Sequence, residues 1–314
     1  MNLAGAEFGD SALPGTYGRD YTYPTASEYD YYASKGLTLI RLPFRWERIQ
    51  PVLGGPLDAT ELARLDKQVA NARARGMRLI LDVHNYGRYR RADASGTLRT
   101  HVIGAADGTV PVSAFQDLWQ RLASHYASES TVWAYGLMNE PHDMGATSWK
   151  EIAQAAVDAI REVDGRHTIL VSGDCWSGAW TWARCNADLL LSDPANNLVY
   201  EAHQYFDRDG SGRYANSYEA DGATPTIGAD RLRPFADWLA ANGVRGFVGE
   251  FGAPNSDPRW QAVLDTFLGS LVEHGIGGTA WAGGPWWPTS YTLRLNPVNG
   301  QDQPQIKTIM ARTR

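Results

Sequence analysis

The chain carries the stretch WAYGLMNEP at residues 133–141, an apolar run that ends in Glu140 and Pro141. A second apolar run, GFVGEFG at residues 246–252, contains Glu250. Both runs have the length and composition of buried strands, in which an unpaired carboxylate is costly in free energy. We therefore expect the two strands to bring both carboxylates to the same end of one sheet. Paired carboxylates are what glycosidic bond cleavage requires, one as acid and the other as nucleophile or base.

Strand-like apolar runs alternate with amphipathic, helix-like segments along the chain. The predicted strands are residues 2–8, 37–42, 78–84, 133–139, 167–173, 197–203, 244–250 and 275–281. The predicted helices are residues 26–34, 60–75, 112–127, 148–163, 228–241, 257–273 and 303–311, whereas the connection at 176–191 is less clearly helical. Short buried strands alternating with helices predict an α/β fold, a single TIM (β/α)8 barrel.

The predicted loops differ in length at the two ends of the strands. Connections from helix to strand are short, whereas those from strand to helix are long, notably 85–111, 205–227 and 282–301. A barrel with its active site at the C-terminal rim of the strands has this asymmetry. The chain shows no repeat and no linker rich in Pro, Thr or Ser. We therefore expect residues 1–314 to form a single catalytic barrel domain with no appended binding module.

Composition and charge exclude several classes of partner. The net charge of −6 disfavours nucleic acid, and the absence of any run of roughly 18 apolar residues argues against a membrane span. The first residues resemble a strand rather than a leader peptide. Cys175 and Cys185 favour a local disulfide and hence a secreted protein whose leader is absent from this chain, the alternative being two free thiols in a reducing compartment. We expect a monomer.

Polar and aromatic residues stand at the ends of six predicted strands. In chain order they are Arg41, His84 with Asn85, Asn139 with Glu140, His203 with Tyr205, Glu250, and Trp281. Any one of them taken alone is explained as a strand-end group satisfied by hydrogen bonds. The C-terminal ends of barrel strands converge on one cavity, so the whole set predicts a single catalytic site.

These residues lie in motifs that resemble glycoside hydrolase family 5. The motifs are Arg41-Leu42-Pro43-Phe44, Val83-His84, Leu137-Met138-Asn139-Glu140-Pro141, Ala202-His203-Gln204-Tyr205, Gly249-Glu250-Phe251-Gly252 and Ala280-Trp281, in the order of that family. The opening residues 2–9 resemble the first strand of its endoglucanase members, and the resemblance covers the whole chain. It implies a retaining endo-β-1,4-glucanase, a cellulase acting on β-glucan, with no cofactor and no metal.

The resemblance also implies a role for each residue. Glu140 would be the general acid and base, protonated before the leaving oxygen departs, and Glu250 would be the ionised nucleophile. Asn139 would bond the 2-hydroxyl of the reacting sugar. Three further groups are substrate-binding candidates. Arg41 and Tyr205 would hold the charge of Glu250. His84 and His203 would form hydrogen bonds around the reacting ring or Glu140, and Trp281 would form a stacking floor.

For further residues of the predicted rim, the sequence indicates a role less specifically. Asp82 and Glu201 lie two residues before His84 and His203 and share a face of their strands. We expect Asp82 to be an interior partner of an Arg or His, and we favour a similar structural role for Glu201 and Glu7. The candidate sugar platforms are Trp46, Trp176, Trp180, Trp182, Trp286 and Trp287, with loop packing favoured for Trp180 and Trp182.

Two other classes of function remain open. A metal-dependent barrel hydrolase would use as ligands His84, His101, His142 and His203, although no strand carries a His-x-His pair. A carbohydrate-binding barrel without turnover would use the same tryptophans, but it has no need of paired carboxylates. Within the enzyme class, mannan or xyloglucan is the alternative to β-1,4-glucan, because one barrel serves many substrates.

Overall fold

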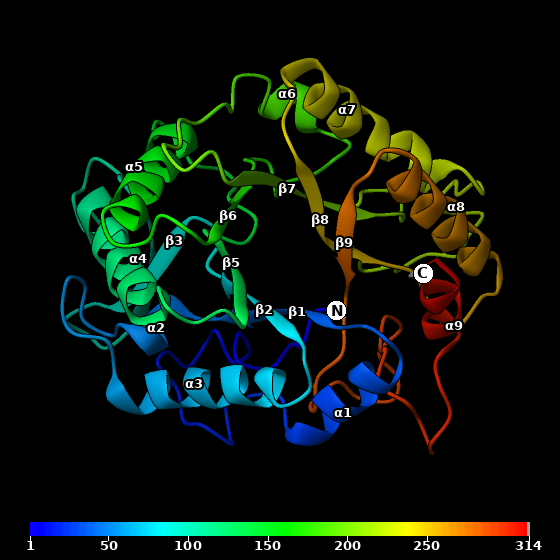
Figure 1. The fold of residues 1–314 in the computed structure, drawn as a ribbon, viewed down its shortest axis with the longest axis horizontal. Coiled ribbons are helices and arrows are strands. Elements are labelled where there is room, and N and C mark those ends of the chain that lie inside the picture. The colour runs from blue at the N-terminus through cyan, green and yellow to red at the C-terminus, as the bar shows by residue number, and fades with distance from the viewer. Residues whose placement is uncertain (313–314) are drawn as a thin grey trace.

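Seven parallel strands form one sheet in the order β1-β2-β5-β6-β7-β8-β9 in the computed structural model, which describes residues 1–312. The strands are β1 (Leu39–Phe44), β2 (Arg78–Val83), β5 (Val132–Gly136), β6 (Thr168–Ser172), β7 (Leu198–Tyr205), β8 (Gly246–Gly252) and β9 (Gly277–Ala280). They surround a central axis, with the helices on the outside (Figure 1). This is the predicted TIM barrel.

Residues 2–6 lie between the two edge strands and close the barrel. Asn2 N–H donates to the carbonyl of Ala280 at 2.9 Å, and Leu3 N–H donates to that of Arg41 at 3.0 Å. The isolated parallel bridges of this segment are Asn2–Arg41, Leu3–Gly283 and Ala6–Phe44. The full strand predicted at residues 2–8 is therefore wrong. Gly5 interrupts it with φ of 145°, and its N–H bonds a side chain instead of a neighbouring strand.

The helices form an outer ring around the sheet (Figure 1). They are α1 (Ala26–Ser34), α2 (Trp46–Ile49), α3 (Ala59–Arg73), α4 (Val112–Tyr126), α5 (Trp149–Arg161), α6 (Trp182–Cys185), α7 (Ile227–Asn242), α8 (Arg259–Glu273) and α9 (Pro304–Arg312). Every predicted helix is confirmed to within two residues at each end. Asp58 and Ser148 cap α3 and α5 by accepting backbone N–H groups three residues on. No helix in residues 1–312 is long and apolar enough to cross a membrane.

Two connections at the rim carry structure that the sequence pattern did not predict. β3 (Arg88–Ala92) and β4 (Leu98–Val102) form an antiparallel hairpin within the loop at 85–111. The arginine-rich hairpin is attached to the barrel because Glu47 Oε1 accepts the backbone N–H of Arg90 at 2.7 Å. The connection after β6 contains only the short helix α6, and a disulfide joins Cys175 to Cys185 across it.

The interior of the barrel has an apolar end and a polar end. A small buried cluster consists of Ile80, Ala134, Leu170, Val199 and Phe247, each at or before the middle of its strand. The C-terminal halves carry buried charged and polar side chains instead. The apolar layer thus closes one end of the barrel, and the charged groups gather at the end where the long loops begin.

Removal of the disulfide should destabilise the protein. We expect Cys175→Ala/Cys185→Ala to lower the free energy of unfolding by about 2–3 kcal/mol, because a cross-link over a loop of this length restricts the unfolded chain by that amount. Denaturant unfolding of the variant and the wild type measures the difference. Thiol titration of the unfolded, unreduced wild type should find no free thiol. Equal stability of the two proteins, or two free thiols, would contradict this expectation.

Candidate active site

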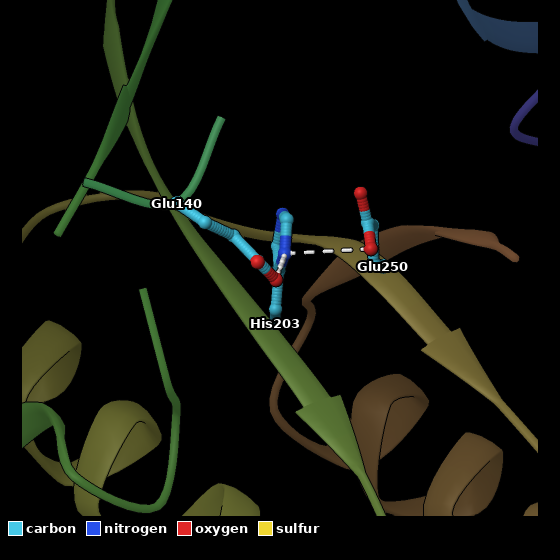
Figure 2. A group of neighbouring side chains, drawn as sticks. All are labelled: Glu140, His203 and Glu250. Carbon is cyan, nitrogen blue, oxygen red and sulfur yellow. Dashed lines mark hydrogen bonds and ion pairs between the residues drawn. The ribbon is translucent and has the colours of Figure 1, made fainter. Parts of the chain in front are cut away.

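Two glutamates and a histidine meet at the C-terminal ends of β5, β7 and β8. Figure 2 shows His203 between Glu140 and Glu250. One carboxylate oxygen of each glutamate and one ring nitrogen of His203 lie within 4.8 Å of one another. Glu140, just after β5, has φ of 44°. A left-handed backbone is uncommon for a residue with a side chain, and such strain is concentrated at functional sites.

The carboxylate of Glu250 is held by two donors. Arg41 Nη1 donates to Oε1 at 2.9 Å, and the hydroxyl of Tyr205 donates to Oε2 at 2.8 Å. Burial, followed by the charge of Glu250, raises the pKa of Tyr205 well above its usual value, so the phenol keeps its proton. Both bonds stabilise a negative charge on Glu250.

Arg41 on β1 is the fully buried centre of this charge cluster. Its guanidinium lies 3.1 Å from Asp82 Oδ1, 2.9 Å from Glu201 Oε1 and 2.9 Å from Glu250 Oε1. Burial opposes the charge of Arg41, but the surrounding carboxylates outweigh that effect and raise its pKa. One cation therefore compensates carboxylates from three different strands, β2, β7 and β8.

Hydrogen bonds determine the orientation of Asn139 and the protonation of His84. Arg41 Nη2 donates to Asn139 Oδ1 at 2.8 Å, so the amide nitrogen faces Nε2 of His84 at 3.2 Å. That ring nitrogen must accept, and His84 therefore carries its proton on Nδ1, facing Asp82 Oδ2 at 2.8 Å. Burial lowers the pKa of His84 to about 3, which agrees with a neutral ring.

His203 is in the opposite charge state, because both of its ring nitrogens face carboxylates. Nδ1 lies 2.7 Å from Glu140 Oε1 and 3.6 Å from Glu250 Oε2, and Nε2 lies 3.5 Å from Glu201 Oε1. Burial disfavours the charged ring, but Glu250, Glu140 and Glu201 outweigh it and raise the pKa of His203 to about 10. His203 is thus an imidazolium at neutral pH.

The protonation of His203 also affects whether the site can bind a metal ion. Within residues 1–312, Glu140, His203 and Glu250 are the one group of three acidic, histidine or cysteine side chains close enough to share an ion. His203 would have to lose a proton to bind a metal, and its raised pKa opposes that loss. The four-histidine metal site considered from the sequence is wrong: His101 contacts Asp107 on the hairpin side, and His142 stacks on Trp176.

A cleft of about 750 Å³ opens beside Glu140. Its wall includes Trp176 and Trp180 from the disulfide-linked loop, which are 49 % and 47 % exposed. The ring of Trp176 stacks on His142 with centroids 4.3 Å apart. The ring of Trp180 lies under the guanidinium of Arg231, 4.4 Å away. Trp180 thus packs against a neighbouring loop residue, as predicted, and also lines the cleft.

A second aromatic group follows β9, the strand next to the one that carries Glu250. Trp281 stacks on His84 with centroids 5.8 Å apart, and its indole N–H donates to the hydroxyl of Tyr291 at 3.0 Å. Trp287 lies edge-on to Trp281 at 6.1 Å and stacks on Tyr291 at 4.1 Å. Aromatic rings thus lie near both glutamates, on the elements after β6 and after β9.

The structure brings the whole predicted set into one site. Those residues are Arg41, His84, Asn139, Glu140, His203, Tyr205, Glu250 and Trp281. Tyr291 was missed, because it lies in a loop with no local motif. Trp46 was wrongly taken as a sugar platform: it is 0 % exposed and packs against Tyr89 and Phe115. Trp182 is buried, in agreement with the packing role favoured for it from the sequence.

Comparisons with known proteins agree with one another. The family model "Cellulase (glycosyl hydrolase family 5)" matches residues 1–286. Endo-beta-1,4-glucanase B of Emericella nidulans is 35 % identical over 302 residues, covering 95 % of this chain and 85 % of the relative. An endoglucanase of Pseudomonas stutzeri, solved with cellobiose, has a TM-score of 0.92 at 39 % identity, covering 100 % of this chain and 91 % of the other. XacCel5A, solved with cellopentaose, has a TM-score of 0.89 at 39 % identity, covering 99 % and 97 %.

Loss of the central cation should be severely destabilising. We expect Arg41→Met to lower the free energy of unfolding by about 3–5 kcal/mol, because it leaves buried carboxylates without a counter-charge. Arg233→Met is the control: it breaks an ion pair with Asp230 in which both side chains are more than half exposed. That variant should change stability by about 0–1 kcal/mol. Denaturant unfolding compares the two, and similar values for both would contradict a central role for Arg41.

Proposed function

This chain belongs to glycosyl hydrolase family 5, and from that membership together with its site we propose that it is an endo-β-1,4-glucanase acting with retention of configuration. The spacing of Glu140 and Glu250 carries the proposal. Their nearest oxygens are within 4.8 Å. Retaining enzymes have carboxyl groups about 5–5.5 Å apart, whereas inverting enzymes need about 6.5–9.5 Å to admit a water molecule.

In the first step, the carboxylate of Glu250 attacks the anomeric carbon and forms a covalent glycosyl ester. At the same time Glu140 gives its proton to the glycosidic oxygen, which leaves as a neutral alcohol. In the second step, Glu140 takes a proton from water, and the resulting nucleophile displaces Glu250 from the anomeric carbon. The bonds from Glu250 to Arg41 and Tyr205 support this assignment, because they stabilise an ionised nucleophile.

The neighbouring residues have supporting roles. The amide nitrogen of Asn139 has two hydrogens, of which one faces His84, so the other is free for the sugar 2-hydroxyl. That bond would strengthen as positive charge develops on the sugar. Neutral His84 holds the amide in place, and Trp281, stacked on His84, offers an aromatic face to the reacting ring.

An extended substrate chain explains why aromatic rings lie on both sides of the site. Trp176 and Trp180 line the cleft beside Glu140, and Trp281 and Trp287 follow the strand next to Glu250. Sugars bound on both sides of the cleaved bond favour cutting within a chain. Binding energy from remote sugars can then be used at the reacting ring. The relative solved with cellopentaose is consistent with a substrate of several sugars.

Three further proposals concern the molecule as a whole. The disulfide between Cys175 and Cys185 supports a secreted protein, because such bonds persist in oxidising compartments. Every residue of the proposed mechanism lies in the one barrel, which supports residues 1–314 acting as a single catalytic domain. We also propose that the protein acts as a monomer, since one chain supplies all of these groups.

The roles of the two glutamates can be separated with small variants. We expect Glu140→Ala and Glu250→Ala each to lose glucanase activity by at least roughly two orders of magnitude, since each removes a group needed in the transition state. With dinitrophenyl cellobioside, added azide should yield the β-azide from Glu140→Ala and the α-azide from Glu250→Ala. NMR of the products reads the configuration.

The matched control is Glu162→Ala, which should keep wild-type activity. Glu162 is an exposed glutamate at the C-terminal end of α5. An α-azide from the Glu140 variant or a β-azide from the Glu250 variant would contradict the assignment.

Internal cutting is expected on soluble β-1,4-glucan. A fast fall in the viscosity of carboxymethylcellulose with few new reducing ends would follow from a site that binds sugars on both sides of the cleaved bond. Mannan and xyloglucan at equal concentration serve as comparison substrates. Faster turnover of either, or release of glucose units alone, would show that the proposed specificity is wrong.

A further inference from the structure

Glu201 is a fully buried acid that no step of the proposed reaction uses. It lies on β7, two residues before His203. Its Oε1 is 2.9 Å from Arg41 Nε and 3.5 Å from His203 Nε2. Burying a carboxylate costs several kcal/mol unless its partners compensate it, so a buried acid beside the histidine that contacts Glu140 calls for a physical explanation.

The surroundings of Glu201 are built to hold it in place. A Cβ atom at position 249 would lie 1.8 Å from Glu201 Oε1, so any side chain there would displace the carboxylate of Glu201. Ser177 donates its hydroxyl to the backbone carbonyl of Glu201 at 2.5 Å and accepts the N–H of His203 on its own carbonyl at 2.8 Å. These contacts hold the backbone of β7 at both residues, and the carboxylate of Glu201 fills the space that a side chain at position 249 would need.

Glu201 and Glu140 together decide how many protons His203 carries. The negative charge of Glu201, 3.5 Å from Nε2, favours a hydrogen on that nitrogen without a hydrogen bond between the two atoms, and Nδ1 carries a hydrogen beside Glu140. Since Nδ1–H donates to Oε1 of Glu140, the proton that Glu140 transfers must sit on its other oxygen, Oε2. His203 thereby determines which oxygen of the acid faces the glycosidic bond.

We propose that Glu201 is a positioning residue for the acid–base step: it keeps His203 positively charged, with Nδ1–H directed at Oε1 of Glu140. The inference rests on the proposed function, because it takes Glu140 as the acid. When the proton leaves Oε2 for the departing oxygen, His203 keeps both of its protons. The carboxylate formed on Glu140 is then stabilised by the charged hydrogen bond from Nδ1.

Five charged groups surround His203, and one of them offers a matched control. They are Arg41 on β1, Asp82 on β2, Glu140 after β5, Glu201 on the same strand and Glu250 on β8. Asp82 is as buried as Glu201 and also pairs with Arg41, but its other partner is His84. Asp82→Asn therefore removes a second buried carboxylate from Arg41 and leaves the contacts of His203 intact.

The charge of His203 can be measured by ¹⁵N NMR of histidine-labelled protein without substrate. In the wild type the ring should stay doubly protonated until the pH approaches about 10. In Glu201→Gln the midpoint should fall by about 1–3 pH units, because a carboxylate stabilises a neighbouring cation by that amount. In Asp82→Asn the shift should be distinctly smaller. Loss of the signal in His203→Asn assigns the resonance.

Kinetics distinguish positioning from structural damage. At a pH between the lowered midpoint of His203 and that of the wild type, Glu201→Gln should lower kcat on glucan about 10-fold or more with little change in KM, since the carboxylate formed on Glu140 loses a charged donor. The loss should be much smaller on dinitrophenyl cellobioside, whose leaving group needs no proton. A merely structural role would lower both rates alike. Glucan cleavage by the wild type tests the proposed function separately, because the NMR titration needs no turnover.

Glu201→Asp is the second variant, in case glutamine at this position prevents folding. It keeps the charge but draws the carboxylate back from Nε2, so the midpoint of His203 should fall less than in Glu201→Gln and kcat should be partly restored. An unchanged midpoint in either folded variant would overturn the proposal. A neutral His203 in the wild type at pH 7 would overturn it as well.

Discussion

The buried guanidinium of Arg41 is the interaction on which the site depends. It contacts carboxylates from three strands and the amide of Asn139, with no exposed surface of its own. Charges buried in this way are stable only when they compensate one another. One cation thus lets a barrel keep several acids at its C-terminal end, stabilises negative charge on Glu250 and orients Asn139. The apolar cluster at the opposite end of the barrel provides the burial that makes such pairing strong.

Two strands carry the same pattern, an acid two residues before a histidine, with opposite results. On β2 the ring of His84 meets Asp82 through one nitrogen and an amide donor through the other, and it stays neutral. On β7 the ring of His203 meets carboxylates through both nitrogens, and it stays charged. The difference arises from the partner across the barrel and not from the strand itself. A neutral ring suits holding Asn139 in place, whereas a charged ring suits an acid that becomes negative during the reaction.

Sequence reasoning succeeded where local pattern and burial coincide. Helix periods, end caps and the apolar runs ending in Glu140 and Glu250 predicted the barrel and the composition of its rim. It failed at Gly5 and at Trp46 for different reasons. Gly5 interrupts the first strand through a local bond from its N–H to the side chain of Glu7, which the strand pattern does not show. Trp46 is buried by Phe115, which is distant in the sequence. The pairing of Glu201 with Arg41 could not be predicted either, because the closure of the sheet decides which side chains meet inside the barrel.

The central claim is that Glu140 and Glu250 divide the work of a double displacement. The initial configuration of the product tests it most directly. Wild-type protein is added to cellopentaose, and ¹H NMR records the anomeric signals of the new reducing ends before mutarotation mixes them. Two displacements at the same carbon predict that the β-anomer forms first and that the α-anomer grows only at the rate of mutarotation. Initial formation of the α-anomer would mean a single displacement by water and would contradict the nucleophilic role of Glu250.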